Sequence, residues 1–208
     1  MKLSEKTLEL NICAQFSAHL KGTANIFWFG LTQKQEAKAG FDACVKLHGR
    51  LLIFQFKASN KHLRNTGDRK FLAPHYQLSA LHSRAKHTAR SVFYALPLVG
   101  NTAEMKKNPD LLAQTWLLDV GGLGHLGAPT KADGSLRRNG CHNMYVRPGS
   151  VTIHSEPLEA QLLNATEFVS GGFRGVDGFQ WQFQNNPSSF LEFCSVLGVG
   201  ARGMFIYE

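Results

Sequence analysis

Two strand-like segments, separated by only two residues, most strongly constrain how this chain can fold. Residues 41–48 (FDACVKLH) and 51–58 (LLIFQFKA) are both rich in apolar, β-branched and aromatic residues, which is typical of β-strands. Gly49 and Arg50 stand between them, and a glycine at the first position of a two-residue loop favours a type II′ turn. The sequence therefore predicts an antiparallel β-hairpin that turns at Gly49-Arg50.

This hairpin would bring three polar side chains together. A two-residue loop fixes the register, so that Asp42 stands opposite Lys57 and Cys44 opposite Gln55. Because side chains alternate between the faces of a sheet, we expect Asp42, Gln55 and Lys57 to project from one face. A cross-strand ion pair between Asp42 and Lys57 on a solvated face is the alternative interpretation, and it would stabilise the hairpin by about 0.2–1 kcal/mol.

An acid, a hairpin and then Gln55-Phe56-Lys57 resemble the motif of the restriction-endonuclease-like PD-(D/E)xK nucleases. The core of that family runs helix, three strands, helix, strand; its acids hold a divalent metal, and its Lys positions or deprotonates the attacking water. The resemblance implies that Asp42 is a metal ligand, that Gln55 occupies the position of the second acid, and that Lys57 is the catalytic Lys. It also implies Mg²⁺ or Mn²⁺ as the cofactor, with the main-chain carbonyl of Phe56 as a further ligand.

The neighbouring segments follow the same order over about the first 100 residues. Ser4 can cap a helix over residues 5–20, in which apolar residues recur at helical spacing. Further expected elements are a strand at 25–30, a helix at 74–87 that starts with a proline, and an apolar strand at 91–99, in which Pro97 indicates an end or an edge.

Gln55 departs from the family pattern, because its neutral amide oxygen brings no charge, whereas hard cations favour carboxylates. A glutamate should supply the missing negative charge. Glu9 is the first candidate, since many relatives carry a metal-site Glu on their first helix. Glu36, in the segment before Asp42, and Glu5, one helical turn before Glu9, are the alternatives.

The chain is basic, with 23 Lys and Arg against 15 acids and a formal net charge of +8. Such an excess favours polyanionic partners. Basic residues directly follow the motif, as expected of a phosphate-binding margin, although a solvated surface would have the same pattern. The candidates for nucleic-acid binding are Lys61, Arg64, Arg69 and Lys70, together with Arg137 and Arg138 in a polar loop at 130–143.

A chain of 208 residues is long enough for one domain with a sizeable core. We expect a single mixed α/β (α+β) domain over 1–208, with a nuclease-like core at about 1–100 and a C-terminal elaboration at about 101–208. In the second part, residues 115–120 predict a buried strand, and 144–154 a hairpin around Pro148-Gly149. Residues 122–127 match G-x-G-x-x-G, but Ala128-Pro129 follow instead of a helix, so we expect no dinucleotide there.

The four cysteines are widely spaced and include no C-x-x-C pair, which favours reduced thiols in a cytoplasmic protein. No apolar stretch approaches the ~20 residues that a membrane-spanning helix needs. The N-terminal sequence also lacks the apolar core of a secretory signal.

Three functions remain open from the sequence. The first is a metal-dependent endonuclease that acts on DNA in preference to RNA, in restriction or phage defence by family association, as a homodimer or with partner proteins of a defence complex. The second is an inactive nuclease-like subunit that binds nucleic acid or assembles a complex, an option that Gln55 keeps open. The third is a metal-independent ribonuclease that uses a pair of the nine histidines as acid and base, although no spacing selects a pair.

Overall fold

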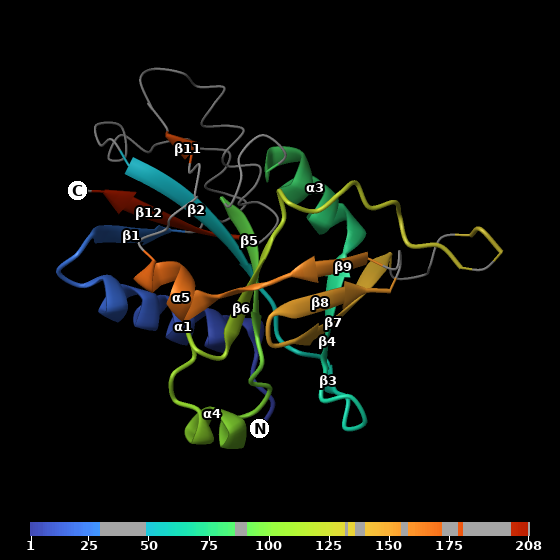
Figure 1. Ribbon diagram of the computed structural model, residues 1–208, viewed down its shortest axis with the longest axis horizontal. Helices are drawn as coiled ribbons and strands as arrows, with labels where there is room; N and C mark the ends of the chain where they lie inside the picture. Colours follow the sequence, from blue (N-terminus) through green and yellow to red (C-terminus); the bar gives the residue numbers. More distant parts are fainter. Residues whose placement is uncertain are drawn as a thin grey trace.

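The computed structural model describes residues 1–29, 49–85, 91–131, 133–135, 140–154, 158–171, 179–180 and 201–207, and all statements on structure refer to these residues. They form two β-sheets and four helices (Figure 1), so the fold is mixed α+β. None of the described helices is long and apolar enough to cross a membrane.

The first sheet is mixed and draws strands from both halves of the chain. Its strand order is β1-β12-β2-β5-β6-β10, and β11 also pairs with β2. The pair β2–β5 is parallel, and the other pairs are antiparallel. The strand bounds are β1 Asn25–Phe29, β2 Gly49–Phe56, β5 Val92–Pro97, β6 Thr115–Asp119, β10 Leu163–Asn164, β11 Phe179–Gln180 and β12 Arg202–Tyr207.

The second sheet is antiparallel, with the order β3-β4-β7-β8-β9. Its strands are β3 Lys61–His62, β4 Arg69–Pro74, β7 Cys141–Arg147, β8 Ser150–Ile153 and β9 Leu158–Gln161. The predicted hairpin around Pro148-Gly149 is confirmed, since Arg147 pairs with Ser150 across it. Gly149 has φ +83°, a left-handed conformation that glycine adopts without a steric penalty.

The helices are α1 Glu5–Leu20, α3 His75–Ala85, α4 Thr102–Lys107 and α5 Ala165–Ser170. The predicted first helix is confirmed, and the Ser4 hydroxyl accepts a hydrogen bond from the backbone N–H of Thr7 at 3.0 Å. Its apolar stripe of Leu8, Ile12 and Phe16 is fully buried. The second predicted helix begins at His75 as α3, and residues 86–90 lie outside the described residues.

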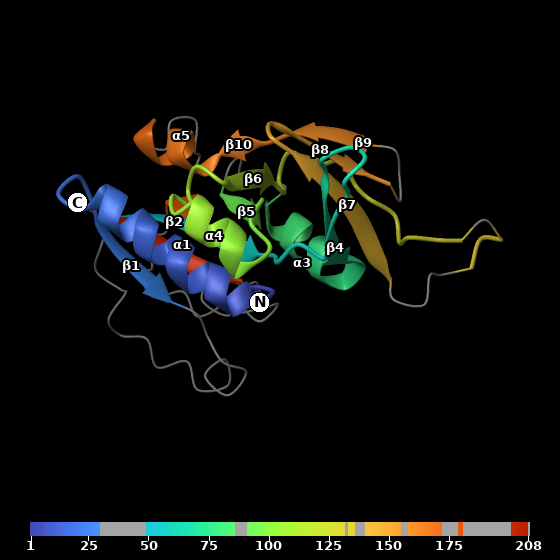
Figure 2. The same cartoon turned by 90° about the horizontal axis from the view of Figure 1, so that it is seen from below.

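Each face of the first sheet is covered by its own hydrophobic core. On one face, α1 and α5 pack on Phe54, Phe93 and Met204. On the other face, α3 and the second sheet pack on Ile53 and Tyr94. In Figure 2, α1 lies toward one end of the molecule, and the second-sheet strands β7, β8 and β9 lie toward the other.

The predicted turn at Gly49-Arg50 is wrong. Both residues belong to β2, where Gly49 pairs with Tyr207 and Arg50 with Ile206 of β12. Over 51–54, β12 occupies one edge of β2, while β11 and β5 pair with the other, so neither edge is left for a hairpin partner. The strand is central in the sheet and apolar on both faces, and its neighbours β5 and β12 come from later parts of the chain. Residues 41–48, with Asp42, lie outside the described residues.

The strand expected at 91–99 is β5, and Pro97 stands at its end. The strand is central, between β2 and β6, so the alternative interpretation of Pro97 as an edge residue does not apply. The strand expected at 115–120 is β6. Strands β6, β10 and β12, from the second half of the chain, belong to the same sheet as β1 and β2. The expected division into a nuclease-like core and a C-terminal elaboration at about residue 100 stays a prediction.

Candidate functional site

Gln55 and Lys57 lie at the carboxyl end of β2, on the face that looks toward the second sheet. Gln55 is in parallel register with Tyr94 of β5, and the Lys57 backbone N–H donates to the Ala95 carbonyl at 3.1 Å. Because side chains alternate along a strand, Gln55 and Lys57 share one face, as the sequence predicts, and Tyr94 joins them. All three residues are buried, with exposed fractions of 4% for Gln55, 6% for Lys57 and 0% for Tyr94.

The Lys57 ammonium is an incompletely compensated buried charge. Its Nζ lies 3.9 Å from Glu5 Oε1 and 6.0 Å from the centre of the Tyr94 ring. Burial lowers the pKa of Lys57, while the negative charges of Glu5 and Cys141 oppose part of this shift. A buried cation of this kind favours an anionic ligand beside it.

Gln55 presents an unsatisfied acceptor at the same place. Its Nε2 donates to the main-chain carbonyl of Phe56 at 3.2 Å, which fixes the orientation of the amide. Its Oε1 is buried and has no hydrogen-bond partner among the described residues. Buried acceptors are nearly always paired, so Gln55 Oε1 is available to a ligand at this site.

Of the two α1 glutamates in the predicted set, Glu5 borders the site and Glu9 does not. Glu9 Oε1 accepts from Lys6 Nζ at 3.0 Å and from Arg202 Nε at 2.6 Å, so two cations already neutralise it. Glu5 stands in the first turn of the helix, is 51% exposed and has Lys57 as its ion-pair partner. These contacts favour Glu5 over Glu9 as the glutamate of the site, the metal role of each stays a prediction, and Glu36 lies outside the described residues.

The predicted basic residues fall into two groups. Lys61 and Arg64 are exposed on β3 and the turn after it, and Lys70 Nζ lies 5.8 Å from the centre of the Tyr145 ring. Arg69 is only 8% exposed, and its guanidinium donates to Glu104 at 2.6 Å and to Ser59 at 3.4 Å. Arg69 thus joins β4 to α4, and we leave it out of the nucleic-acid surface. Arg137 and Arg138 lie outside the described residues.

Tyr94 is the residue that sequence reasoning missed. Its hydroxyl is buried and has no hydrogen-bond partner among the described residues. Burial raises the pKa of Tyr94 well above its ordinary value, and the charges of Tyr76, Glu5 and Cys141 add to this effect. In the sequence, Tyr94 is one aromatic residue of an apolar strand. Only its register with Gln55 on the neighbouring strand shows that it belongs to this site.

Two of the described histidines are joined through their ring nitrogens. His75 Nδ1 and His142 Nε2 lie 3.0 Å apart, and His142 is fully buried. Because each ring occupies a nitrogen of the other, this pair is poorly arranged to flank a substrate as separate acid and base.

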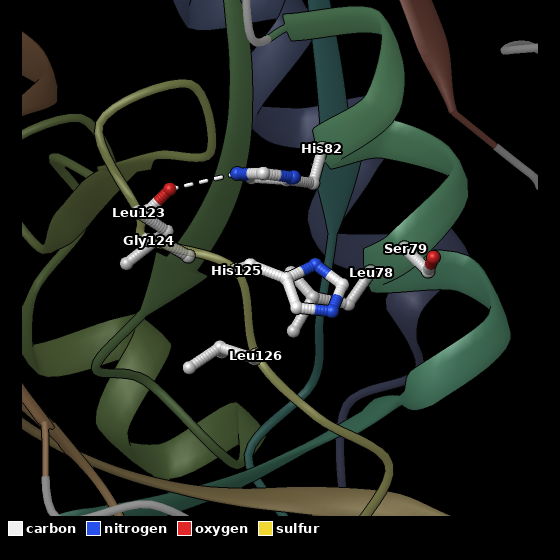
Figure 3. A pocket seen from close by; sticks show the side chains of 7 residues that line it. All are labelled: Leu78, Ser79, His82, Leu123, Gly124, His125 and Leu126. Carbon is white, nitrogen blue, oxygen red and sulfur yellow. Dashed lines mark hydrogen bonds between the residues drawn. The ribbon is translucent and has the colours of Figure 1, made fainter.

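The glycine-rich run at 122–127 lies in the loop after β6, beside α3 (Figure 3). His82 Nε2 donates to the Leu123 carbonyl at 2.7 Å, and the loop and the helix line a partly open cavity of about 10 Å³, the space of one water molecule. No helix begins within the described residues 121–131, so no helix N-terminus faces this loop as a dinucleotide site requires.

Among the described residues, no group of three or more His, Cys, Asp or Glu side chains is placed to hold a metal ion. Two of the predicted ligands, Asp42 and Glu36, lie outside those residues. No known protein family, curated protein or solved structure matches this chain. Any functional conclusion therefore depends on the chemistry of the residues themselves.

Proposed function

We propose that this chain is a metal-dependent nuclease that hydrolyses DNA phosphodiester bonds. The observation that carries the proposal is the position of Lys57, a buried ammonium that shares a sheet face with Gln55 and approaches the Glu5 carboxylate at 3.9 Å. Metal-assisted phosphodiester hydrolysis needs oxygen ligands for the cation, which an amide and a carboxylate can provide. It also needs a positive group beside the negative charge that develops on the phosphate, which an ammonium can provide.

The order of elements supports a restriction-endonuclease-like core. The elements α1, β1, β2, α3 and β5 succeed one another as helix, strands, helix and strand, and β3 and β4 of the second sheet come between β2 and α3. Strands β2 and β5 are adjacent and parallel, as in a βαβ unit. Gln55 and Lys57 lie at the carboxyl end of β2, the end at which ligands bind in open α/β sheets.

Mg²⁺ or Mn²⁺ fits the donors at this end of the strand, which are oxygen atoms. Gln55 Oε1, the Phe56 carbonyl and a carboxylate from Glu5 or Asp42 would hold the ion, and the role of Asp42 stays a prediction. When bound, the ion would polarise a phosphate oxygen and acidify a water molecule.

Lys57 would serve the reaction from the protein side. In its charged form, the ammonium has three donors for the attacking water and for the charge that builds on the phosphate. Because burial lowers its pKa, Lys57 also gives up a proton more readily than a surface lysine does. Glu5 orients the ammonium by attraction and limits the fall of the pKa.

The proposal of a nucleic-acid substrate depends on the positive charge of the chain. The formal net charge of +8, with exposed Lys61 and Arg64 a few residues after Lys57, favours a polyanion over a neutral substrate. We propose DNA in preference to RNA, and a role in phage defence or restriction, in the cytoplasm, as a homodimer or with partner proteins, by family association alone.

The test is incubation of the purified protein with plasmid, linear duplex, single-stranded DNA and RNA, each with Mg²⁺, Mn²⁺ or EDTA. We expect cleavage of DNA that EDTA abolishes and that Asp42→Ala and Lys57→Ala each remove, while folding and DNA binding persist. Lys107→Ala, at an exposed position on α4, is the matched control. Metal-dependent cleavage that survives both site variants would assign the activity to other residues.

The same assay addresses the two alternatives. Binding of DNA without cleavage under every condition would favour an inactive nuclease-like subunit, for which the neutral Gln55 is the supporting observation. Cleavage of RNA in EDTA would favour the histidine-based ribonuclease, and replacement of each histidine in turn would identify the acid and the base.

A further inference from the structure

Three buried polar side chains interrupt the apolar layer between the first sheet and the elements that cover it. Gln55, Lys57 and Tyr94 project from adjacent strands into the face where Ile53, Val92 and Leu96 are buried. Polar groups in such a layer cost free energy unless they are paired. Their positions therefore need an explanation.

Two of the buried polar atoms have no hydrogen-bond partner, and the ammonium beside them has only a long ion pair. Tyr94 carries a buried hydroxyl, and Gln55 a buried carbonyl oxygen, for which the described residues provide no hydrogen-bond partner. Lys57 Nζ has the Glu5 carboxylate at 3.9 Å, which is longer than a charge-assisted hydrogen bond. An oxygen-rich anion that accepts from Tyr94 and Lys57 would satisfy both donor groups at once.

Tyr94 also lies beside Lys57. The Lys57 Nζ is 6.0 Å from the centre of the Tyr94 ring, so the phenol and the ammonium occupy one part of this layer. Because burial raises the pKa of Tyr94, its hydroxyl keeps its proton near neutral pH. Tyr94 is therefore available there as a hydrogen-bond donor, and neither as a base nor as a nucleophile.

We infer that the Tyr94 hydroxyl donates a hydrogen bond to a non-bridging oxygen of the phosphate that Lys57 contacts. The inference rests on the proposed nuclease function and adds a residue to its site. No bond forms or breaks at Tyr94, and its proton stays on the phenol oxygen. The hydrogen bond strengthens as negative charge builds on the phosphate, so Tyr94 contributes mainly to the rate of the chemical step.

Tyr94→Phe tests this role, because it removes one oxygen and leaves the buried ring in place. We expect the rate of DNA cleavage under single-turnover conditions to fall on the order of 10²-fold, as for the loss of one donor to a developing oxyanion. DNA affinity should change little. The melting temperature should stay the same or rise by up to about 2–4 °C, because an unpaired buried hydroxyl is lost.

Tyr145→Phe is the matched control, since Tyr145 alternates with the buried Met144 and Val146 and lies on the other face of the second sheet. It should leave the cleavage rate unchanged. A Tyr94→Phe protein that cleaves as fast as wild type, while Lys57→Ala is inactive, overturns the inference and leaves the nuclease proposal standing. A melting temperature that changes without any change in cleavage also overturns it, because Tyr94 would then be structural only.

A second measurement separates this inference from the nuclease proposal. If wild type cleaves no nucleic acid, the proposed function fails, and the melting temperature is then measured with millimolar inorganic phosphate and with a short duplex oligonucleotide. Stabilisation of wild type by either anion that is lost in Tyr94→Phe supports a phosphate contact by Tyr94. Equal stabilisation of both proteins, or none, overturns it. A response to the duplex but not to free phosphate identifies nucleic acid as the source of the phosphate.

Discussion

Lys57 Nζ lies 3.9 Å from the Glu5 carboxylate, although Lys57 follows a central strand and Glu5 begins the first helix. The Lys57 side chain is 7% exposed and that of Glu5 is 51% exposed, so a buried cation faces a solvated anion. Water screens an anion in such a position, and the ion pair therefore compensates only part of the desolvation of Lys57. A bound phosphate would neutralise the part of the Lys57 charge that Glu5 leaves uncompensated.

Glu5→Gln and Glu9→Gln should have different effects, although the two residues stand on the same helix. Glu5→Gln removes the carboxylate beside Lys57 and should lower the cleavage rate by about an order of magnitude or more. Glu9→Gln should preserve cleavage, but it leaves Arg202 without its carboxylate and should cost about 1.5–3 kcal/mol of unfolding free energy. Cleavage assays and urea denaturation measure the two effects. Equal losses of cleavage in both variants would refute the assignment of Glu5 to the site.

Lys57→Met should remove the increase in unfolding free energy that the wild type gains from Lys57 at alkaline pH. Burial, partly opposed by Glu5, lowers the pKa of Lys57 below 10.5, so between the lowered value and 10.5 the unfolded chain binds a proton that the folded chain does not. The folded state therefore gains stability as pH rises through this window. Lys57→Met should be the more stable protein at neutral pH, and its advantage should shrink as pH rises toward 10. Urea denaturation of both proteins at several pH values measures this difference, and a constant advantage would contradict it.

Local rules predicted the parts of this fold that depend on neighbouring residues. Ser4 as a cap and the buried stripe of Leu8, Ile12 and Phe16 are properties of one helix, and both are confirmed. The shared face of Gln55 and Lys57 follows from alternation along one strand, and Tyr94 lies beside both: it is in register with Gln55, and its ring centre is 6.0 Å from Lys57 Nζ.

The failures depend on contacts between distant segments. Gly49-Arg50 has the composition of a turn, but β12, from the end of the chain, pairs along it and draws it into β2. Glu5 rather than Glu9 borders Lys57 because of where the start of α1 meets the end of β2, which no spacing within the helix encodes. The unpaired hydroxyl of Tyr94 is likewise visible only after β5 is placed beside β2.

Arg69→Met should destabilise the fold and leave DNA affinity nearly unchanged. Losing the charge-assisted hydrogen bonds of this buried guanidinium should cost about 1.5–3 kcal/mol of unfolding free energy. Gly100→Ala should cause a related loss, because its added Cβ would stand 2.7 Å from Arg69 Nη1. A stable Arg69→Met protein with weakened DNA binding would instead restore Arg69 to the phosphate-binding surface.

The partner of Arg69 should also make stability sensitive to acid. Partial burial alone would raise the pKa of Glu104, but hydrogen bonds from the Gly100 backbone N–H and from Arg69 outweigh it and lower the pKa below 4.5. The stabilisation is therefore complete above pH 4.5 and is lost as pH falls through the lowered value. Glu104→Gln should lose much of this acid-dependent decrease, as measured by urea denaturation between about pH 3 and about pH 6, a range that includes the unfolded pKa of 4.5. An unchanged profile would contradict the assignment.

Lys61→Ala and Arg64→Ala should each weaken DNA binding in a salt-dependent way. If each exposed cation neutralises one phosphate of duplex DNA, its loss should reduce the slope of log affinity against log salt by about 0.9. Binding titrations at several salt concentrations measure the slope, with Lys107→Ala on α4 as the control of equal charge. A uniform loss of affinity without a change of slope would exclude direct phosphate contacts by these two residues.

Gln55→Glu should make the melting temperature of the protein depend strongly on Mg²⁺. In the wild type, Gln55 Nε2 donates to the Phe56 carbonyl at 3.2 Å, a bond that an ionised glutamate cannot make. The new carboxylate would be buried against a carbonyl oxygen, so in EDTA the variant should melt at a lower temperature than wild type. Mg²⁺ should restore the melting temperature, because a hard cation binds a carboxylate more tightly than an amide and stabilises only the folded state. Thermal unfolding and calorimetric Mg²⁺ titration of both proteins measure this reversal. If Mg²⁺ affects the variant no more than wild type, residue 55 is not a metal ligand, and the oxygen ligands of the proposed site must come from elsewhere.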